Sequence, residues 1–259
     1  MSLLEDLTAG SVADASARKE LRPQAAVEKA AREQTPALDA LELLAPAEHI
    51  KIIAEVKRAS PSRGHLSEIP DPAQLAVTYQ TGGASAISVL TEQRKFKGSL
   101  ADLEAVRAAV EIPVLRKDFI ATEYQVLEAR ATGADLVLLI VAALPQQRLA
   151  ELHALVRELG MTALVEAHSE EEIDRALEVG AGLVGVNARD LTTFELDKDL
   201  FGRVADRIPS GVIRVAESAV LARKDVERYR NAGADVVLVG EALVTDGDPI
   251  RTLEKFLSV

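Results

Sequence analysis

Charged side chains stand at the ends of apolar stretches in this sequence, where a buried strand would reach a surface. Glu55 and Lys57 end the run from residue 51 to 57, and a Ser-Pro-Ser turn follows them. Residues two apart in a strand point to the same face, so these opposite charges share one side. A carboxylate and an ammonium placed together compensate one another and could exchange protons with a bound molecule.

The same arrangement recurs further along the chain. Inward-facing polar groups of this kind are Lys117, Glu166, Asn187, Arg189 and Glu217. One charge at a strand end usually marks the point where the chain meets water, but several converging charges indicate a site, because isolated buried charges are costly. Arg116, Asp118 and Asp190 fall on the opposite face, and we expect them to meet water, although either aspartate could orient an inward neighbour.

Eight short apolar runs, each followed by a helical stretch, would position these groups. Amphipathic stretches such as 145–159 and 221–232 lie between the runs, which predicts a parallel sheet covered by helices. Gly-Ala pairs recur about every 50 residues, before every second run, as expected for helix ends that feed strands. The pattern favours a closed (β/α)8 TIM barrel, α/β in class, over an open doubly wound sheet. The expected strands are 51–57, 84–90, 112–119, 134–141, 162–168, 183–190, 212–218 and 235–241.

Residues 1–45 do not belong to this repeat. We expect them to form an N-terminal helical extension of a single domain that spans residues 1–259. We expect breaks near Gly10 and at Pro23 and Pro36, with a helix over 37–45. The extension either packs against the barrel as a plug or lies over its active face as a flap.

Composition excludes several classes of function. A net charge of −11 argues against non-specific nucleic-acid binding, and the absence of cysteine excludes disulfides, thiol catalysis and cysteine-based metal sites. The longest apolar run, 136–144, is too short to cross a membrane, and the first ten residues lack a secretion signal. We therefore expect a cytoplasmic protein with no membrane partner.

The four histidines are scattered and show no helical metal-ligand spacing, which favours a metal-free acid–base mechanism. His168, two residues after Glu166, is either near the site or a solvated loop residue. In such barrels the loops after the last two strands often bind phosphate, and Ser218 and Gly240 lie there. Ser60 could close the same cradle from the first strand.

The sequence also resembles the indole-3-glycerol phosphate synthase family of tryptophan biosynthesis along essentially its whole length. The segments that carry the resemblance are "IIAEVKRASPSRG", "LTEQRKFKGSL", "IPVLRKDFI", "ADLVLLIVAAL", "GMTALVEAH", "GVNARDL", "VAES" and "VLVGEALV". The resemblance implies a lyase that closes, decarboxylates and dehydrates a carboxyphenylamino-deoxyribulose phosphate by acid–base catalysis, without cofactor or metal.

Residue roles follow from the same resemblance. Lys117 matches the general acid, Lys57 the lysine that contacts the substrate carboxylate and protonates the departing hydroxyl, and Glu166 the general base. Glu55 matches an acid–base or orienting partner, and Glu217 a third site carboxylate. Further matched positions are Asn187 and Arg189 for holding the substrate, Ser60, Ser218 and Gly240 for phosphate, and Pro61, Phe96, Phe119, Leu139 and Leu191 for the apolar wall; Leu139 could equally be core.

Two positions of the phosphate site depart from the common family pattern. Ala219 replaces a usual glycine, and a positive φ there would cost about 1 kcal/mol. Glu241 stands at a position where the family often has serine, and we expect its carboxylate to point away from the phosphate. Alternatives are a sister phosphate-binding barrel, such as phosphoribosylanthranilate isomerase or the tryptophan synthase α-subunit, and a non-catalytic or engineered scaffold. For partners we expect only a small phosphorylated substrate and a monomeric state.

Overall fold

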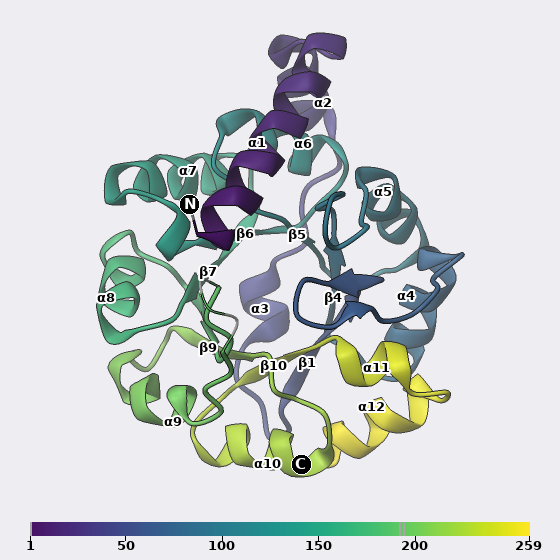
Figure 1. The fold of residues 1–259 in the computed structure, drawn as a ribbon, viewed down its shortest axis with the longest axis vertical. Coiled ribbons are helices and arrows are strands. Elements are labelled where there is room, and N and C mark those ends of the chain that lie inside the picture. Colours follow the sequence, from purple (N-terminus) through teal and green to yellow (C-terminus); the bar gives the residue numbers. More distant parts are fainter. Residues whose placement is uncertain (1, 192, 194) are drawn as a thin grey trace.

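Eight parallel strands close into a barrel in the computed structural model, which describes residues 2–191, 193 and 195–259 (Figure 1). Each strand pairs with two neighbours, and β1 pairs with both β4 and β10, which closes the ring. The TIM barrel is confirmed and the open sheet is wrong. The barrel strands are β1 (Lys51–Val56), β4 (Ala86–Leu90), β5 (Val114–Lys117), β6 (Leu136–Ile140), β7 (Thr162–Ala167), β8 (Leu183–Asn187), β9 (Ile213–Glu217) and β10 (Val236–Val239).

Helices surround the ring and connect each strand to the next (Figure 1). The four repeated glycines end helices in the left-handed region, with φ of 94° at Gly83, 91° at Gly133, 78° at Gly180 and 91° at Gly233, which confirms the repeat. A small hairpin of β2 (Ala59–Ser60) and β3 (Gly64–His65) follows β1. The surrounding helices are α4 (Pro72–Thr81), α5 (Leu100–Ala109), α6 (Glu123–Ala131), η1 (Val141–Ala143), α7 (Gln146–Glu158), α8 (Glu170–Glu178), α9 (Leu200–Val204), η2 (Ala205–Arg207), α10 (Arg223–Asn231), α11 (Glu241–Thr245) and α12 (Pro249–Leu257).

Two apolar layers hold this arrangement together. Inward side chains such as Ile53, Leu115 and Leu164 fill the barrel, while outward side chains of the same strands pack against the helices. Since both faces of each strand are buried, the strands read as continuous aliphatic runs rather than as alternating patterns.

The N-terminal extension consists of three helices, α1 (Leu3–Leu21), α2 (Gln24–Glu33) and α3 (Ala40–Leu44). The predicted break near Gly10 is wrong, because α1 runs through it. A Cβ on Gly10 would lie 3.2 Å from the Arg94 side chain, so tertiary packing uses the glycine within a continuous helix. The break at Pro23 is confirmed, since this residue precedes the first turn of α2.

The extension reaches both ends of the barrel. In α3, the carbonyl oxygen of Leu43 accepts a 2.7 Å hydrogen bond from Lys51, the first residue of β1. In α1, Ser11 Oγ donates a 2.7 Å bond to Asp118, which follows the last residue of β5. Thus α3 lies at the amino ends of the strands and α1 at their carboxyl ends. None of the helices in the described part of the chain is long and apolar enough to span a membrane.

Candidate active site

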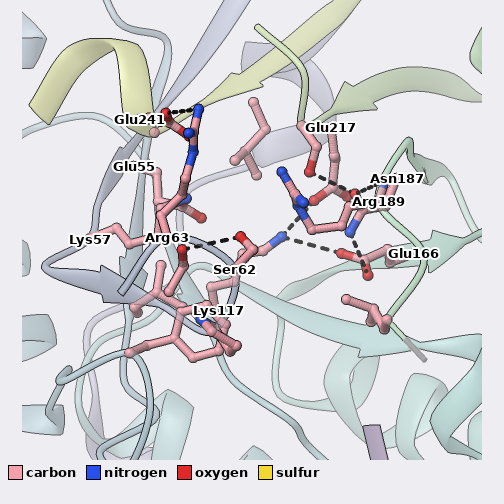
Figure 2. Close-up of a pocket in the computed structure, with 18 of the residues that line it drawn as sticks. Glu55, Lys57, Ser62, Arg63, Lys117, Glu166, Asn187, Arg189, Glu217 and Glu241 are labelled. Atoms are coloured by element: carbon pink, nitrogen blue, oxygen red, sulfur yellow. Dashed lines mark hydrogen bonds and ion pairs between the residues drawn. The ribbon is translucent and has the colours of Figure 1, made fainter. Parts of the chain in front are cut away.

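A pocket opens at the carboxyl ends of the strands (Figure 2). Figure 2 shows Glu55 and Lys57 on one side of it and Glu166, Asn187 and Glu217 on the other. The predicted site residues that line it are Glu55, Lys57, Ser60, Pro61, Phe96, Lys117, Phe119, Glu166, Asn187, Arg189, Leu191, Glu217, Ser218, Ala219, Gly240 and Glu241. Leu139 is the one predicted site residue outside this lining.

Lys117 lies between two buried carboxylates. Its Nζ is 2.5 Å from Glu217 Oε2 and 3.2 Å from Glu166 Oε2. The three residues end or nearly end β5, β7 and β9, and parallel strands of a barrel bring those ends to one rim. Both carboxylate side chains are only 1% exposed, so their interaction with the ammonium is poorly screened by water.

These contacts shift the pKa values of all three groups. Burial alone would lower the pKa of Lys117, but Glu217, Glu166 and Glu55 raise it above its ordinary value, so the side chain is an ammonium. Burial opposes ionisation of Glu166, but Lys117, His168 and Asn187 hold its pKa below the usual range. Burial and the charge of Glu166 raise the pKa of Glu217 to about 8 despite the contact with Lys117. One ammonium therefore faces one carboxylate and one neutral carboxyl group at neutral pH.

A second acid–base pair comes from β1. Lys57 Nζ donates a hydrogen bond to Glu55 Oε2, and the side chains are 18% and 4% exposed. Gly240 leaves room for them: a Cβ there would lie 2.4 Å from Glu55 Oε2 and 2.8 Å from Lys57 Nζ. The glycine after β10 thus accommodates this ion pair, a reason that differs from the approach to phosphate expected from sequence.

Asn187 connects Glu166 to the loop after β9. Its Nδ2 donates to Glu166 Oε1 at 3.2 Å, and its Oδ1 accepts from Ser218 Oγ at 2.8 Å. The backbone N–H of Arg189 donates to the same Oδ1 at 3.0 Å. Because both the N–H and the oxygen of the Asn187 amide are hydrogen-bonded, the orientation of the amide is fixed, and its bond to Glu166 fixes the position of that carboxylate.

The loop after β9 is held in an unusual conformation. Ser218 and Ala219 have φ of 67° and 57°, in the left-handed region that alanine rarely adopts. Ala219 therefore has the positive φ whose cost was considered from the sequence. Nearby, Arg63 pairs with Glu241 at 2.7 Å at the mouth of the pocket (Figure 2). The orientation of Glu241 relative to phosphate stays a prediction, and Arg63 is a lining residue that sequence reasoning missed.

Two aromatic rings form part of the apolar wall, with centroids of Phe96 and Phe119 6.1 Å apart. The assignment of Leu139 to this wall is wrong: its side chain is fully buried in the outer layer, against the helices. Leu138 and Ile140 line the pocket instead. Every residue of this strand is apolar, so the sequence contained no alternation that could identify the inward face.

Two further expectations need correction. Arg116 and Asp118 do not meet water; they are 0% and 5% exposed and pair with one another at 3.0 Å. Asp190 is exposed, as expected. His168 is not a solvated loop residue, because its side chain is 10% exposed and its Nε2 lies 3.4 Å from Glu166 Oε1. Its position two residues after Glu166 was the available signal.

Comparison with known proteins agrees with this geometry. The family model for indole-3-glycerol phosphate synthase matches residues 4–256. An indole-3-glycerol phosphate synthase of Leifsonia xyli subsp. xyli is 69% identical over 259 residues, covering 100% of this chain and 99% of its own. That of Rhodococcus jostii is 58% identical, with 98% and 94% covered.

A solved structure supports the fold alone. The N-acetylmannosamine-6-phosphate 2-epimerase of Clostridium perfringens superposes with a TM-score of 0.62 at 14% identity, covering 85% of this chain and 96% of its own. The assignment to a family rests instead on the full-length match of sequence and on the order of the site residues along it. The chain belongs to the indole-3-glycerol phosphate synthase family.

Proposed function

We propose that this pocket carries out the indole-3-glycerol phosphate synthase reaction with Lys117 as the first acid and Glu166 as the base. The observation that supports these roles is the buried cluster of Lys117, Glu166 and Glu217 at the rim of the barrel. Lys117 is an ammonium with a raised pKa, and Glu166 is a carboxylate with a lowered one, so each has the protonation state its role requires.

The reaction begins at the substrate carbonyl. The ring carbon that bears the carboxylate attacks the ribulose carbonyl carbon, a C–C bond forms, and Lys117 gives a proton to the oxygen, which becomes a hydroxyl. Carbon dioxide then leaves, and the electrons of the broken C–C bond restore the aromatic ring. Glu217, neutral at neutral pH, accepts a hydrogen bond from Lys117 and holds it in place without removing its proton.

Dehydration needs a second acid and a base. Lys57, paired with Glu55 on the other side of the pocket, protonates the departing hydroxyl, which leaves as water. Glu166 takes a proton from the new ring, and the double bond of the indole forms. Two ammonium groups, one at the end of β5 and one just after β1, allow the two acid steps to use different donors.

The phosphate of the substrate would lie beside β9, β10 and β1. Ser218 and Ser60 supply hydroxyl groups there, and Gly240 and Ala219 supply backbone. Phe96, Phe119, Pro61 and Leu191 would enclose the aromatic ring, and Arg189 would hold the substrate. These strands are neighbours in the closed barrel, so the serines lie within one part of the pocket.

The N-terminal extension would cover the active face through α1, as part of a single domain. Its bond from Ser11 to Asp118 at the end of β5 supports that placement. We also propose a cytoplasmic monomer, because the chain is acidic and without cysteine, and because a closed barrel offers no free sheet edge for pairing.

Lys117→Ala tests the acid role. We expect turnover of the carboxyphenylamino-deoxyribulose phosphate, followed by indole fluorescence, to fall by about 10²-fold or more, with an unchanged circular dichroism spectrum. Lys51→Ala is the matched control, since Lys51 lies at the opposite end of β1 and contacts α3. Near wild-type turnover by the Lys117 variant would show that another group is the acid.

A further inference from the structure

A histidine behind the pocket wall contacts the proposed base. His168 follows β7 by one residue and does not line the pocket. Its Nε2 lies 3.4 Å from Glu166 Oε1, and its Nδ1 lies 3.1 Å from Glu172 Oε2 on α8. Within the described residues Nε2 has no well-aligned hydrogen-bond acceptor, which leaves Glu166 as its contact. The imidazole thus stands between two carboxylates, one inside the site and one outside it.

The outer carboxylate is firmly placed. Glu172 Oε2 also accepts a 2.8 Å bond from the backbone N–H of His168, and the Glu172 N–H donates to Ser169 at the start of α8. Because an ionised carboxylate can only accept, the His168 Nδ1 must carry a proton. A lone pair on Nε2 would face the second carboxylate and repel it, so the ring carries both protons while Glu166 is ionised.

The charged groups around Glu166 show why a doubly protonated His168 affects this carboxylate. The ammonium of Lys117 from β5 is shared between Glu166 and Glu217 from β9. Asn187 from β8, the other partner of Glu166, is neutral. His168 is therefore a second cation in contact with a carboxylate that is 1% exposed. Although burial lowers the pKa of His168, Glu166 and Glu172 raise it to about 10, so the ring stays charged through the neutral range.

We propose that His168, held by Glu172, is a positioning residue that orients Glu166 and keeps it ionised as the base of the reaction. The proposal rests on the base role of Glu166 given above. His168 does not touch the pocket, so it acts on catalysis through the carboxylate alone. Asn187 and His168 contact the same oxygen, Oε1, and leave Oε2 for Lys117 and the substrate.

His168→Gln tests the charge. Glutamine retains an amide donor of similar reach and removes the cation. We expect the acid-side midpoint of the kcat–pH profile to move upward by about 1 pH unit or more, because a cation within contact distance of a carboxylate lowers its pKa by roughly that amount. We expect KM at neutral pH to change by less than about twofold, since no substrate contact is lost.

Two further variants keep the test decisive. Glu172→Gln leaves the imidazole in place but weakens its charge, and we expect a smaller shift in the same direction. The matched control is His153→Gln in α7, a buried histidine whose pKa is lowered by burial and which provides no cation to the site. If His168→Gln does not fold, the partly exposed Glu172 side chain still allows the measurement.

The outcomes separate this proposal from the assignment of the base. Coincident pH profiles for the wild type and the His168 and Glu172 variants would overturn the positioning role, as would an equal shift in the His153 control. Glu166→Gln tests the base role itself. If that variant loses turnover while the pH profile of His168→Gln is unshifted, Glu166 remains the base and only the positioning role of His168 is rejected. Full turnover by Glu166→Gln would reject both.

Discussion

The left-handed turn after β9 makes a quantitative prediction about stability. Ala219 has φ of 57°, and a left-handed conformation costs an alanine about 1–2 kcal/mol relative to glycine. Replacement by glycine removes this cost, but it also increases the conformational entropy of the unfolded chain, which destabilises by about 0.4–1 kcal/mol. We therefore expect Ala219→Gly to raise the free energy of unfolding by about 0.8 kcal/mol, within limits of about 0 and 1.6 kcal/mol.

Ala121→Gly is a control in the corresponding loop after β5. Ala121 is also half-buried, but its φ is not positive and it is not a helix cap, so glycine gains nothing there. Both variants add one glycine to the unfolded chain, so the entropy terms cancel in their difference. We expect Ala121→Gly to lose about 0.4–1 kcal/mol, and the two variants to differ by about 1–2 kcal/mol.

Urea unfolding followed by circular dichroism measures this difference through the midpoint and the slope m. The slope should not change, because neither substitution alters the surface buried on folding. KM of the Ala219→Gly variant should not rise, since its backbone N–H is retained at the proposed phosphate site. If the two variants were destabilised equally, the turn would be unstrained and the argument from φ would be refuted.

Two other perturbations follow from the environment of Glu217. A Cβ on Gly185 would lie 2.1 Å from Glu217 Oε1, so Gly185→Ala should displace that carboxyl group, reduce kcat and lower the free energy of unfolding by about 1–3 kcal/mol. In the control Gly202→Ala, the nearest contact of the new Cβ would be at 3.8 Å, so this variant should be tolerated. Equal tolerance of both variants in kinetics and urea unfolding would contradict the packing argument. Because the native pKa of Glu217 is about 8, the folded protein holds a proton that the unfolded chain releases above its ordinary pKa of 4.5, so this group's contribution to stability is lost as pH rises between those values. Thermal unfolding of Glu217→Gln over that range should show a smaller fall in stability than the wild type, and parallel curves would refute the raised pKa.

The fold was predictable because its signals are local. Eight aliphatic runs and four helix-ending glycines are visible in the sequence, and only a closed barrel brings all eight carboxyl ends to one rim. The charged residues could be recognised for the same reason: Glu55, Lys117 and Glu166 interrupt runs that are otherwise apolar. A polar residue in such a run is informative, whereas an apolar one is not, so the sequence of this strand offers no correction to the assignment of Leu139 that the resemblance implies.

Contacts between distant segments were not predictable. Arg116 was expected at the surface because it faces away from the pocket, but α6 supplies Glu128 at 3.1 Å, and α1 supplies Arg18 to the same carboxylate at 2.6 Å. No spacing in the sequence relates these three residues. His168 was ambiguous for a related reason, because its environment depends on how the chain turns from β7 into α8.

At the end of β5, side chains that alternate between the two faces of the strand connect the N-terminal extension to the pocket. Lys117 and Phe119 line the pocket, whereas Arg116 bonds to Glu128 of α6, and Asp118, which also borders the pocket, bonds to Ser11 of α1. Asp118 accepts from Thr91, Arg116 and the Phe119 N–H within the barrel, and Ser11 of α1 adds one more donor to this buried charge. Because members of a buried hydrogen-bond network strengthen one another, the position of α1 and the position of the strand that carries Lys117 are energetically linked. An extension that looks separate in the sequence thereby becomes part of the support of Lys117, the proposed acid.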